Sequence, residues 1–183
     1  YSRLLVDLNR AIGNSRLIRT RSDGHQIPFN RGLSTEQIGR RIVSYYEPYR
    51  QAVSEHVAQI VERYGRCVHL CVHTFTPVLQ GKVRGNDVGL LYDPSRHPEA
   101  ELARALRQEL AARTGLTVWL NRPYQGPADG ILPRIREAHP AHHYLGIELE
   151  INQRFASRPE ELGRIAEQFS RSLQTLASLR EWA

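Results

Sequence analysis

The sequence predicts an α/β fold with three layers, in which a mainly parallel or mixed twisted sheet is flanked by helices. Short apolar segments alternate along the chain with longer segments of helical period, which is the pattern that predicts this class. The chain has 183 residues, 40% of them hydrophobic and 24% charged, so we expect one globular domain over residues 1–183. The length excludes a protein of many domains, and the balance of hydrophobic and charged residues excludes a disordered chain.

Four short strands are expected. In the second of them, Val68, Leu70 and Val72 alternate with Cys71 and the two histidines at 69 and 73. The apolar segments that predict strands span residues 3–8, 67–74, 116–120 and 144–151. A further short apolar segment follows a glycine-rich stretch at 90–92.

The helices have recognisable starts and stops. Ser34 and Gln37 have the spacing of a capping box at the start of a helix that runs to about Gly65, and Pro48 should kink or split that helix. Further helices are expected at 99–113, where Gly115 should end the helix, at 132–138 and from about 157 onward. Residues 13–33 are rich in glycine and polar side chains and predict a long loop.

The formal net charge of +6 raises the hypothesis of a nucleic-acid partner. Lys82 is the only lysine among the 25 basic residues, and the arginines are scattered, with Arg40-Arg41 the only adjacent pair. Phosphate-binding surfaces usually gather their cations into a patch. We therefore favour a compositional bias toward arginine and expect no nucleic-acid partner.

The two cysteines, Cys67 and Cys71, fall on one face of a single strand, about 13 Å apart, which is too far for a disulfide. Reduced thiols, the lack of an apolar run of about 20 residues and the lack of a signal sequence predict a cytoplasmic protein without a membrane partner. The chain begins at Tyr1 and contains no methionine, so we expect its N-terminal part to be missing.

Polar side chains lie near the ends of the predicted strands: Asn9 and Arg10, then His73, then Glu148 and Glu150. Alternation places Glu148 and Glu150 on the same face of their strand. Open α/β sheets bind ligands at the carboxyl ends of their strands. From the residues alone the interpretations stay open, because Arg10 could pair with Asp7 and His73 could be either a core histidine or a ligand. We expect Glu148 to pair with an arginine.

Seven short motifs occur in the order found in one enzyme family. They are VDLNR (6–10), QIPFNRGLS (26–34), YYEPY (45–49), VHTFTPV (72–78), GLLYD (89–93), NRPYQG (121–126) and IELEINQ (147–153). Together they span nearly the whole chain. The sequence resembles the N-formylglutamate amidohydrolase family, which is itself similar to zinc carboxypeptidases, so the resemblance also implies a zinc-exopeptidase-like fold.

The resemblance implies a role for each matching residue. Asn9 and Arg10 would hold a substrate carboxylate, and His73 would be a ligand of one zinc ion. Glu150 would be the general base, in preference to Glu148 because Asn152 and Gln153 follow it at the family's spacing. Tyr124 would contact the substrate, although the family usually has NQPY where this chain has NRPY.

The implied reaction is metal-dependent hydrolysis of N-formyl-L-glutamate to formate and L-glutamate, a step of histidine degradation. Other N-acyl amino acids or peptides are alternative substrates, and a non-catalytic carboxylate-binding relative is an alternative function. Carboxypeptidase-like sites take a second histidine and a carboxylate from a segment upstream of the D-x-N-R segment, which is Asp7–Arg10 in this chain. No H-x-x-E occurs in this sequence, so we expect the remaining zinc ligands upstream of Tyr1.

Overall fold

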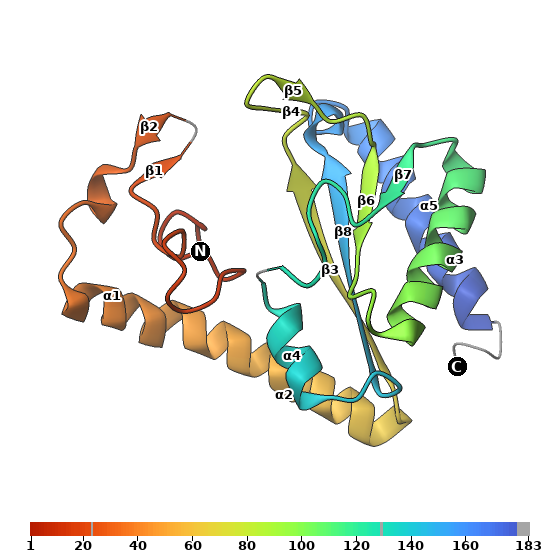
Figure 1. The fold of residues 1–183 in the computed structure, drawn as a ribbon, viewed down its shortest axis with the longest axis horizontal. Coiled ribbons are helices and arrows are strands. Elements are labelled where there is room, and N and C mark those ends of the chain that lie inside the picture. The colour runs from red at the N-terminus through yellow and green to blue at the C-terminus, as the bar shows by residue number, and fades with distance from the viewer. Residues whose placement is uncertain (23, 129, 179–183) are drawn as a thin grey trace. The chain divides into compact units, whose positions relative to one another are not determined.

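The computed structural model describes residues 1–22, 24–128 and 130–178 (Figure 1). The chain divides into two compact units. The first unit contains Tyr1–Cys67 and Asp129–His143, and the second contains Val68–Ala128 and Tyr144–Ala183. The expectation of a single domain stays a prediction.

A nearly continuous helical segment dominates the first unit. It consists of α1 (Thr35–Arg41), a π-helical turn η2 (Ile42–Tyr46) and α2 (Glu47–Tyr64). The predicted capping box is confirmed, because the Ser34 hydroxyl accepts from the Gln37 N–H at 3.2 Å and the Gln37 side chain accepts from the Ser34 N–H at 2.9 Å. The π-helical turn directly precedes Pro48, whose ring disfavours a regular α-helical turn, so the predicted interruption is found there.

The strand predicted at residues 3–8 is wrong, because this segment forms turns. Three of its backbone carbonyls accept hydrogen bonds from side chains: Leu4 from Asn30, Leu5 from Arg41 and Leu8 from Arg50. Side-chain donors thus replace the backbone N–H groups that a neighbouring strand would supply. The apolar residue Val6 is nevertheless buried, in a small core with Leu17 and Tyr46.

The expected loop at 13–33 contains short regular elements. A two-residue antiparallel hairpin joins β1 (Arg21–Ser22) to β2 (His25–Gln26), and the 3-10 helix η1 (Pro28–Asn30) follows. Asn30 is buried and also donates to the Arg19 carbonyl at 2.7 Å. The last helix of the unit, α4 (Leu132–Ala138), has the predicted bounds.

The second unit is built on a four-stranded sheet. Its strand order is β3 (Cys67–Phe75), β8 (Tyr144–Asn152), β6 (Val88–Leu91) and β7 (Val118–Leu120), as Figure 1 shows. β6 pairs with β7 in parallel and with β8 in antiparallel orientation. Of the two predicted arrangements, the mixed twisted sheet is therefore confirmed. A short hairpin of β4 (Val78–Leu79) and β5 (Lys82–Val83) follows β3.

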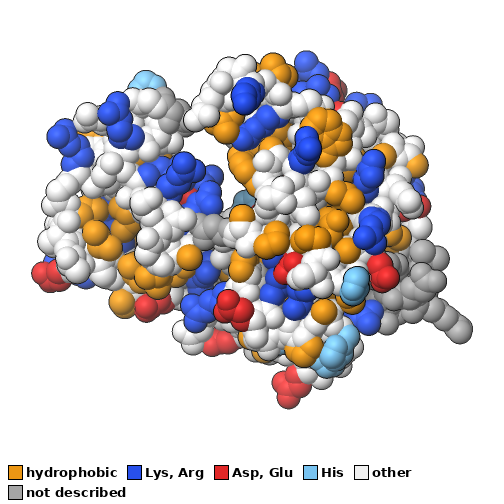
Figure 2. All heavy atoms as spheres, viewed as in Figure 1, with side chains coloured by type: hydrophobic (Ala, Val, Ile, Leu, Met, Phe, Trp, Pro, Cys, Tyr) orange, Lys and Arg blue, Asp and Glu red, His pale blue; other side chains and the backbone are white. Residues whose placement is uncertain are grey.

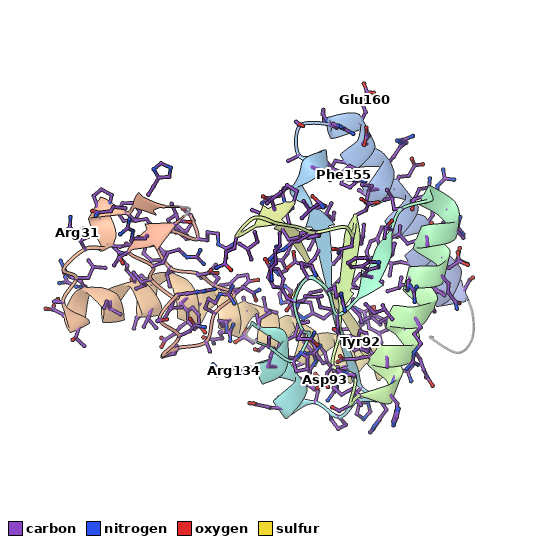
Figure 3. All side chains as sticks on the ribbon, turned by 45° about the horizontal axis from the view of Figure 1, so that its top comes forward. Arg31, Tyr92, Asp93, Arg134, Phe155 and Glu160 are labelled. Carbon is purple, nitrogen blue, oxygen red and sulfur yellow. The ribbon has the colours of Figure 1, made fainter. Side chains whose placement is uncertain are left out.

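Two helices, α3 (His97–Thr114) and α5 (Pro159–Ser178), pack with this sheet around the main core. Leu102, Leu106 and Leu110 of α3 lie in the core, together with Ile165 and Phe169 of α5. Phe155, labelled in Figure 3, belongs to the 3-10 helix η3 (Gln153–Phe155) between β8 and α5 and is buried in the same core. Gly115 ends α3 with a positive φ of 69°, as predicted. The third layer of the predicted architecture stays a prediction.

Surface charge and helix composition bear on possible partners. In Figure 2, Lys and Arg side chains lie at several separate places on the visible face. Within the part of the chain that the structure describes, no helix is long and apolar enough to cross a membrane.

Candidate active site

The sheet of the second unit has one apolar and one polar face. On β8, Leu145, Ile147, Leu149 and Ile151 belong to the core, so the residues between them point to the opposite face. On β3, Leu70 packs against the core, and the alternate residues point away from it. The opposite face, which we call the polar sheet face, therefore carries these side chains: His69, Cys71, His73, Glu148 and Glu150.

The contacts at both ends of β3 and β8 fix how these hydrogen-bonded neighbours are aligned. At their starts, the Cys67 N–H donates to the His143 carbonyl at 2.8 Å, which sets Cys67 opposite Tyr144 in a parallel pair, and at their ends Gln153 Nε2 donates to Thr74 Oγ1 at 3.1 Å. The two strands thus run in the same direction. This alignment places His73 level with Glu150 on neighbouring strands, which lie about 4.8 Å apart in a sheet.

Glu150 sits in the middle of the sheet. It pairs in register with Gly89 of β6, and both Glu150 and Glu148 are only 6% exposed. A carboxylate at such a position is costly unless it is paired or used, because burial disfavours its charged form. The predicted pairing of Glu148 with an arginine stays a prediction.

The NRPYQG loop begins directly beside Glu150. A Cβ atom added to Gly89 would clash with the Arg122 carbonyl oxygen, so this position requires the missing side chain of glycine. Asn86 holds the same carbonyl through its Nδ2 atom at 3.3 Å. The Asn121 Oδ1 atom accepts from the Tyr92 N–H at 3.0 Å and from the Gly126 N–H at 3.2 Å. Tyr92 directly follows β6 and is labelled in Figure 3.

Tyr124 projects from this fixed loop and is 42% exposed. Its hydroxyl accepts a hydrogen bond from Arg84 Nη1 at 3.0 Å, and the Arg84 guanidinium lies 5.0 Å from the centre of its ring. Arg84 could not be identified from the sequence, because a single arginine in a glycine-rich stretch has no characteristic spacing. The aromatic partners that single it out come from distant segments.

His69 is a hydrogen-bonded histidine. Its Nδ1 contacts the buried Tyr144 hydroxyl, and its Nε2 lies 3.3 Å from Cys71 Sγ. Both ring nitrogens of His69 thus have a neighbour within the second unit. Neither Cys67 nor Cys71 forms a disulfide, as predicted, and burial raises the pKa of the Cys67 thiol.

The D-x-N-R segment lies in the first unit and is organised around Asp7. This carboxylate is 3% exposed and accepts from Arg3 Nη2 at 2.6 Å and from Arg19 Nη2 at 3.0 Å. Arg10 Nε is 3.7 Å from the same oxygen, so the pairing of Arg10 with Asp7 that the sequence suggested is present. Asp7 thereby steadies the Arg10 guanidinium.

Asn9 links this segment to the start of α4. Its Oδ1 accepts from the Ile131 N–H at 3.1 Å, and its own N–H donates to Asp7 Oδ1 at 3.3 Å. The next residue is also held, because the Tyr46 hydroxyl donates to the Arg10 carbonyl at 2.7 Å. Packing within the first unit thus fixes the backbone of both predicted carboxylate-binding residues.

The predicted site residues are therefore divided between the units. Asn9 and Arg10 belong to the first unit, whereas His73, Tyr124 and Glu150 belong to the second. The structure brings His73 and Glu150 together, and the convergence of all five residues stays a prediction. Among the described residues, no three or more His, Cys, Asp or Glu side chains are grouped as a metal ion would require. These residues do not fit a three-ligand zinc site by themselves.

Comparison with solved structures supports the fold. The Atu2144 gene product from Agrobacterium tumefaciens has a TM-score of 0.71 and 26% identity, over 96% of this chain and 69% of that one. N-formylglutamate amidohydrolase from Ralstonia eutropha JMP134 has a TM-score of 0.78 and 22% identity, over 99% of this chain and 75% of that one. A comparison with curated proteins found no match.

The family assignment comes from the sequence profile of N-formylglutamate amidohydrolase, which matches residues 1–156. The matched region includes the D-x-N-R segment, the NRPYQG loop and all of β8. This agrees with the resemblance seen in the seven motifs. The chain belongs to the N-formylglutamate amidohydrolase family, a family of amide hydrolases.

Proposed function

We propose that this protein hydrolyses the N-formyl amide of an acidic amino acid, with N-formyl-L-glutamate as substrate and formate and L-glutamate as products. The observation that carries the proposal is the buried Glu150 carboxylate level with His73 on the polar sheet face. Membership of an amidohydrolase family supports the reaction class. In this proposal the reaction takes place in the cytoplasm and belongs to histidine degradation.

Glu150 is the proposed general base. Its carboxylate accepts a proton from the attacking water and returns that proton to the departing amine nitrogen. Proton transfer by a positioned side chain typically accelerates a reaction about 10²- to 10⁴-fold. The middle of a sheet suits this role, since the strand pairing of β8 with β6 holds the carboxylate in place.

Arg10 and Asn9 are the proposed carboxylate-binding residues. A guanidinium forms two parallel, charge-assisted hydrogen bonds with a carboxylate, which fixes both the position and the orientation of the ligand. Asp7 lies behind the Arg10 guanidinium and limits its movement. A substrate held in this way keeps its amide aligned for attack. Tyr124 is a further proposed substrate contact.

We also propose zinc as the cofactor, with His73 as one of its ligands. The proposal rests on the family resemblance and on the position of His73, which is half-buried on the polar sheet face. Since the described residues group no three ligands, the steps assigned here to Glu150 and Arg10 are stated without the metal.

Formate release from N-formyl-L-glutamate tests the proposal. We expect Glu150→Gln to lower kcat about 10²- to 10⁴-fold while leaving zinc content unchanged. Glu148→Gln is the matched control, because Glu148 is equally buried on the same face of the same strand. Its kcat should stay close to that of the wild type. Equal losses in both variants would contradict the assignment of the base.

Metal analysis of the purified protein tests the role of His73. We expect His73→Ala to lose both zinc and turnover, whereas the wild type retains zinc. Equal zinc in both proteins would show that His73 is not a ligand. A wild type that binds glutamate but releases no formate with added zinc would instead support the alternative of a carboxylate-binding relative.

A further inference from the structure

Arg84 contacts two aromatic rings in the second unit. Its guanidinium carbon lies 5.7 Å from the centre of the Phe75 ring and 5.0 Å from the centre of the Tyr124 ring. Nη1 donates to the Tyr124 hydroxyl at 3.0 Å and to the Thr76 carbonyl at 3.4 Å. The contacts fix the plane of the guanidinium and occupy one of its three nitrogens.

Among the residues that the structure describes, no carboxylate balances the positive charge of Arg84. Other arginines of the second unit form ion pairs: Arg96 with Glu99, Arg113 with Glu109 and Arg154 with Asp87. In the described ranges 1–22, 24–128 and 130–178, no carboxylate lies within ion-pair distance of Arg84. A fixed guanidinium without an acidic partner is suited to binding an anion, because its charge and its fork of N–H donors remain to be satisfied.

Both rings that hold Arg84 belong to segments of the candidate site. Phe75 follows His73 by two residues on β3, so the two side chains point to the same face of the sheet. Tyr124 belongs to the loop whose Arg122 backbone packs against Gly89, the residue in register with Glu150. Arg84 therefore lies beside the polar sheet face rather than on the core side.

We propose that Arg84 binds the side-chain carboxylate of an acidic substrate and so selects it over substrates with neutral side chains. The inference rests on the proposed function, and it assigns the second of the two carboxylates that an N-acyl glutamate carries. The Nε and Nη2 edge of Arg84 binds this side-chain carboxylate, whereas the other carboxylate is the one that the proposed function assigns to Asn9 and Arg10. A neutral side chain would leave this guanidinium without a partner, which is the kind of mismatch that gives strong discrimination.

Binding of two small probes tests the proposal without requiring catalysis. The probes are glutarate, with two carboxylates, and its monoamide glutaramate, with one, measured by calorimetry. We expect the wild type to bind glutarate about 10- to 100-fold more tightly, and Arg84→Gln to bind both probes about equally. Arg84→Lys should retain a small part of the preference, because a point charge does not reproduce the fork.

Arg107→Gln is the matched control. It removes the same charge from an exposed position of α3, whose apolar side packs into the core. It should keep the preference of the wild type for glutarate, so that a loss in Arg84→Gln reports a local contact and not the net charge. If Arg84→Gln keeps the wild-type preference, or if Arg107→Gln loses it equally, the proposal is overturned.

Kinetics with N-formyl-L-glutamate and N-formyl-L-glutamine separate the inference from the proposed function. Arg84→Gln should lower kcat/KM for the glutamate substrate about 10- to 100-fold and leave the glutamine substrate nearly unchanged. Equal losses for both substrates would mean a structural role and would overturn the proposal. If the wild type hydrolyses neither substrate, the proposed function fails, and the ratio of the two probe affinities still decides the role of Arg84.

Discussion

The two units use their polar side chains in different ways. In the first unit, arginines serve the backbone and the buried Asp7: Arg41 and Arg50 donate to main-chain carbonyls, and Arg3 and Arg19 donate to Asp7. In the second unit, the strands satisfy each other's backbone groups through the sheet. Its polar side chains are therefore available to line one face. Regular strand pairing in the second unit allows polar side chains to gather on one sheet face. In the first unit, the irregular segments use their polar side chains to satisfy backbone carbonyls and a buried carboxylate.

The same comparison explains the arginine-rich composition. Several of the arginines in the first unit are partly or largely buried and hold the chain together, Arg50 among them with 6% exposure. Arg50 donates to the carbonyls of both Leu8 and Gly130, at 3.2 Å in each case. Part of the net positive charge thus has a structural origin, which fits the interpretation of the composition as a bias rather than as a nucleic-acid footprint.

Removing the charge at the centre of the first unit should have the largest effect. Asp7→Asn leaves the guanidiniums of Arg3, Arg19 and Arg10 without their shared carboxylate, and breaking a buried ion pair typically costs about 3–5 kcal/mol. Urea unfolding followed by circular dichroism measures the loss. Glu36→Gln, which breaks an exposed pair with Arg40, is the control and should cost less than about 1 kcal/mol. Similar losses in the two variants would contradict the central role of Asp7.

In the second unit the corresponding test is steric. Gly89→Ala places a methyl group against the Arg122 carbonyl, and we expect a destabilisation of about 1–3 kcal/mol together with lower activity, since the loop that carries Tyr124 must move. Gly163→Ala is the control on α5, where an added Cβ meets nothing within 4 Å. It should raise stability by up to about 1 kcal/mol. Thermal unfolding and formate release measure both effects, and an unchanged Gly89→Ala variant would contradict the close packing.

The sequence allowed good prediction of elements that depend on local signals. The capping box at Ser34, the interruption near Pro48 and the end of α3 at Gly115 each depend on a few neighbouring residues, and all three are found. The strand predicted at 3–8 failed because pairing depends on distant partners. Here the carbonyls of that segment bond to side chains from η1, α1 and α2.

The site shows the same limit. Alternation along the strands correctly placed Glu148 and Glu150 on one face of β8 and His69 and His73 on one face of β3. Arg84 could not be predicted, because its significance comes from Phe75 and Tyr124, which lie in separate segments. Periodicity thus predicts which face of a strand each side chain lies on. The contacts of an arginine in a loop depend on packing between distant segments, which periodicity does not predict.

The smallest effect is expected from changing the shape of a cation while keeping its charge. Arg10→Lys retains a positive charge near Asp7, but an ammonium group cannot offer two parallel N–H donors to a carboxylate. We expect KM for N-formyl-L-glutamate to rise about fivefold, equivalent to about 1 kcal/mol, with kcat nearly unchanged. Arg16→Lys, at an exposed position of the same unit, is the control and should leave KM unchanged. An unchanged KM in Arg10→Lys would mean that the substrate carboxylate binds elsewhere, and it would leave Arg84 as the principal cation for the ligand.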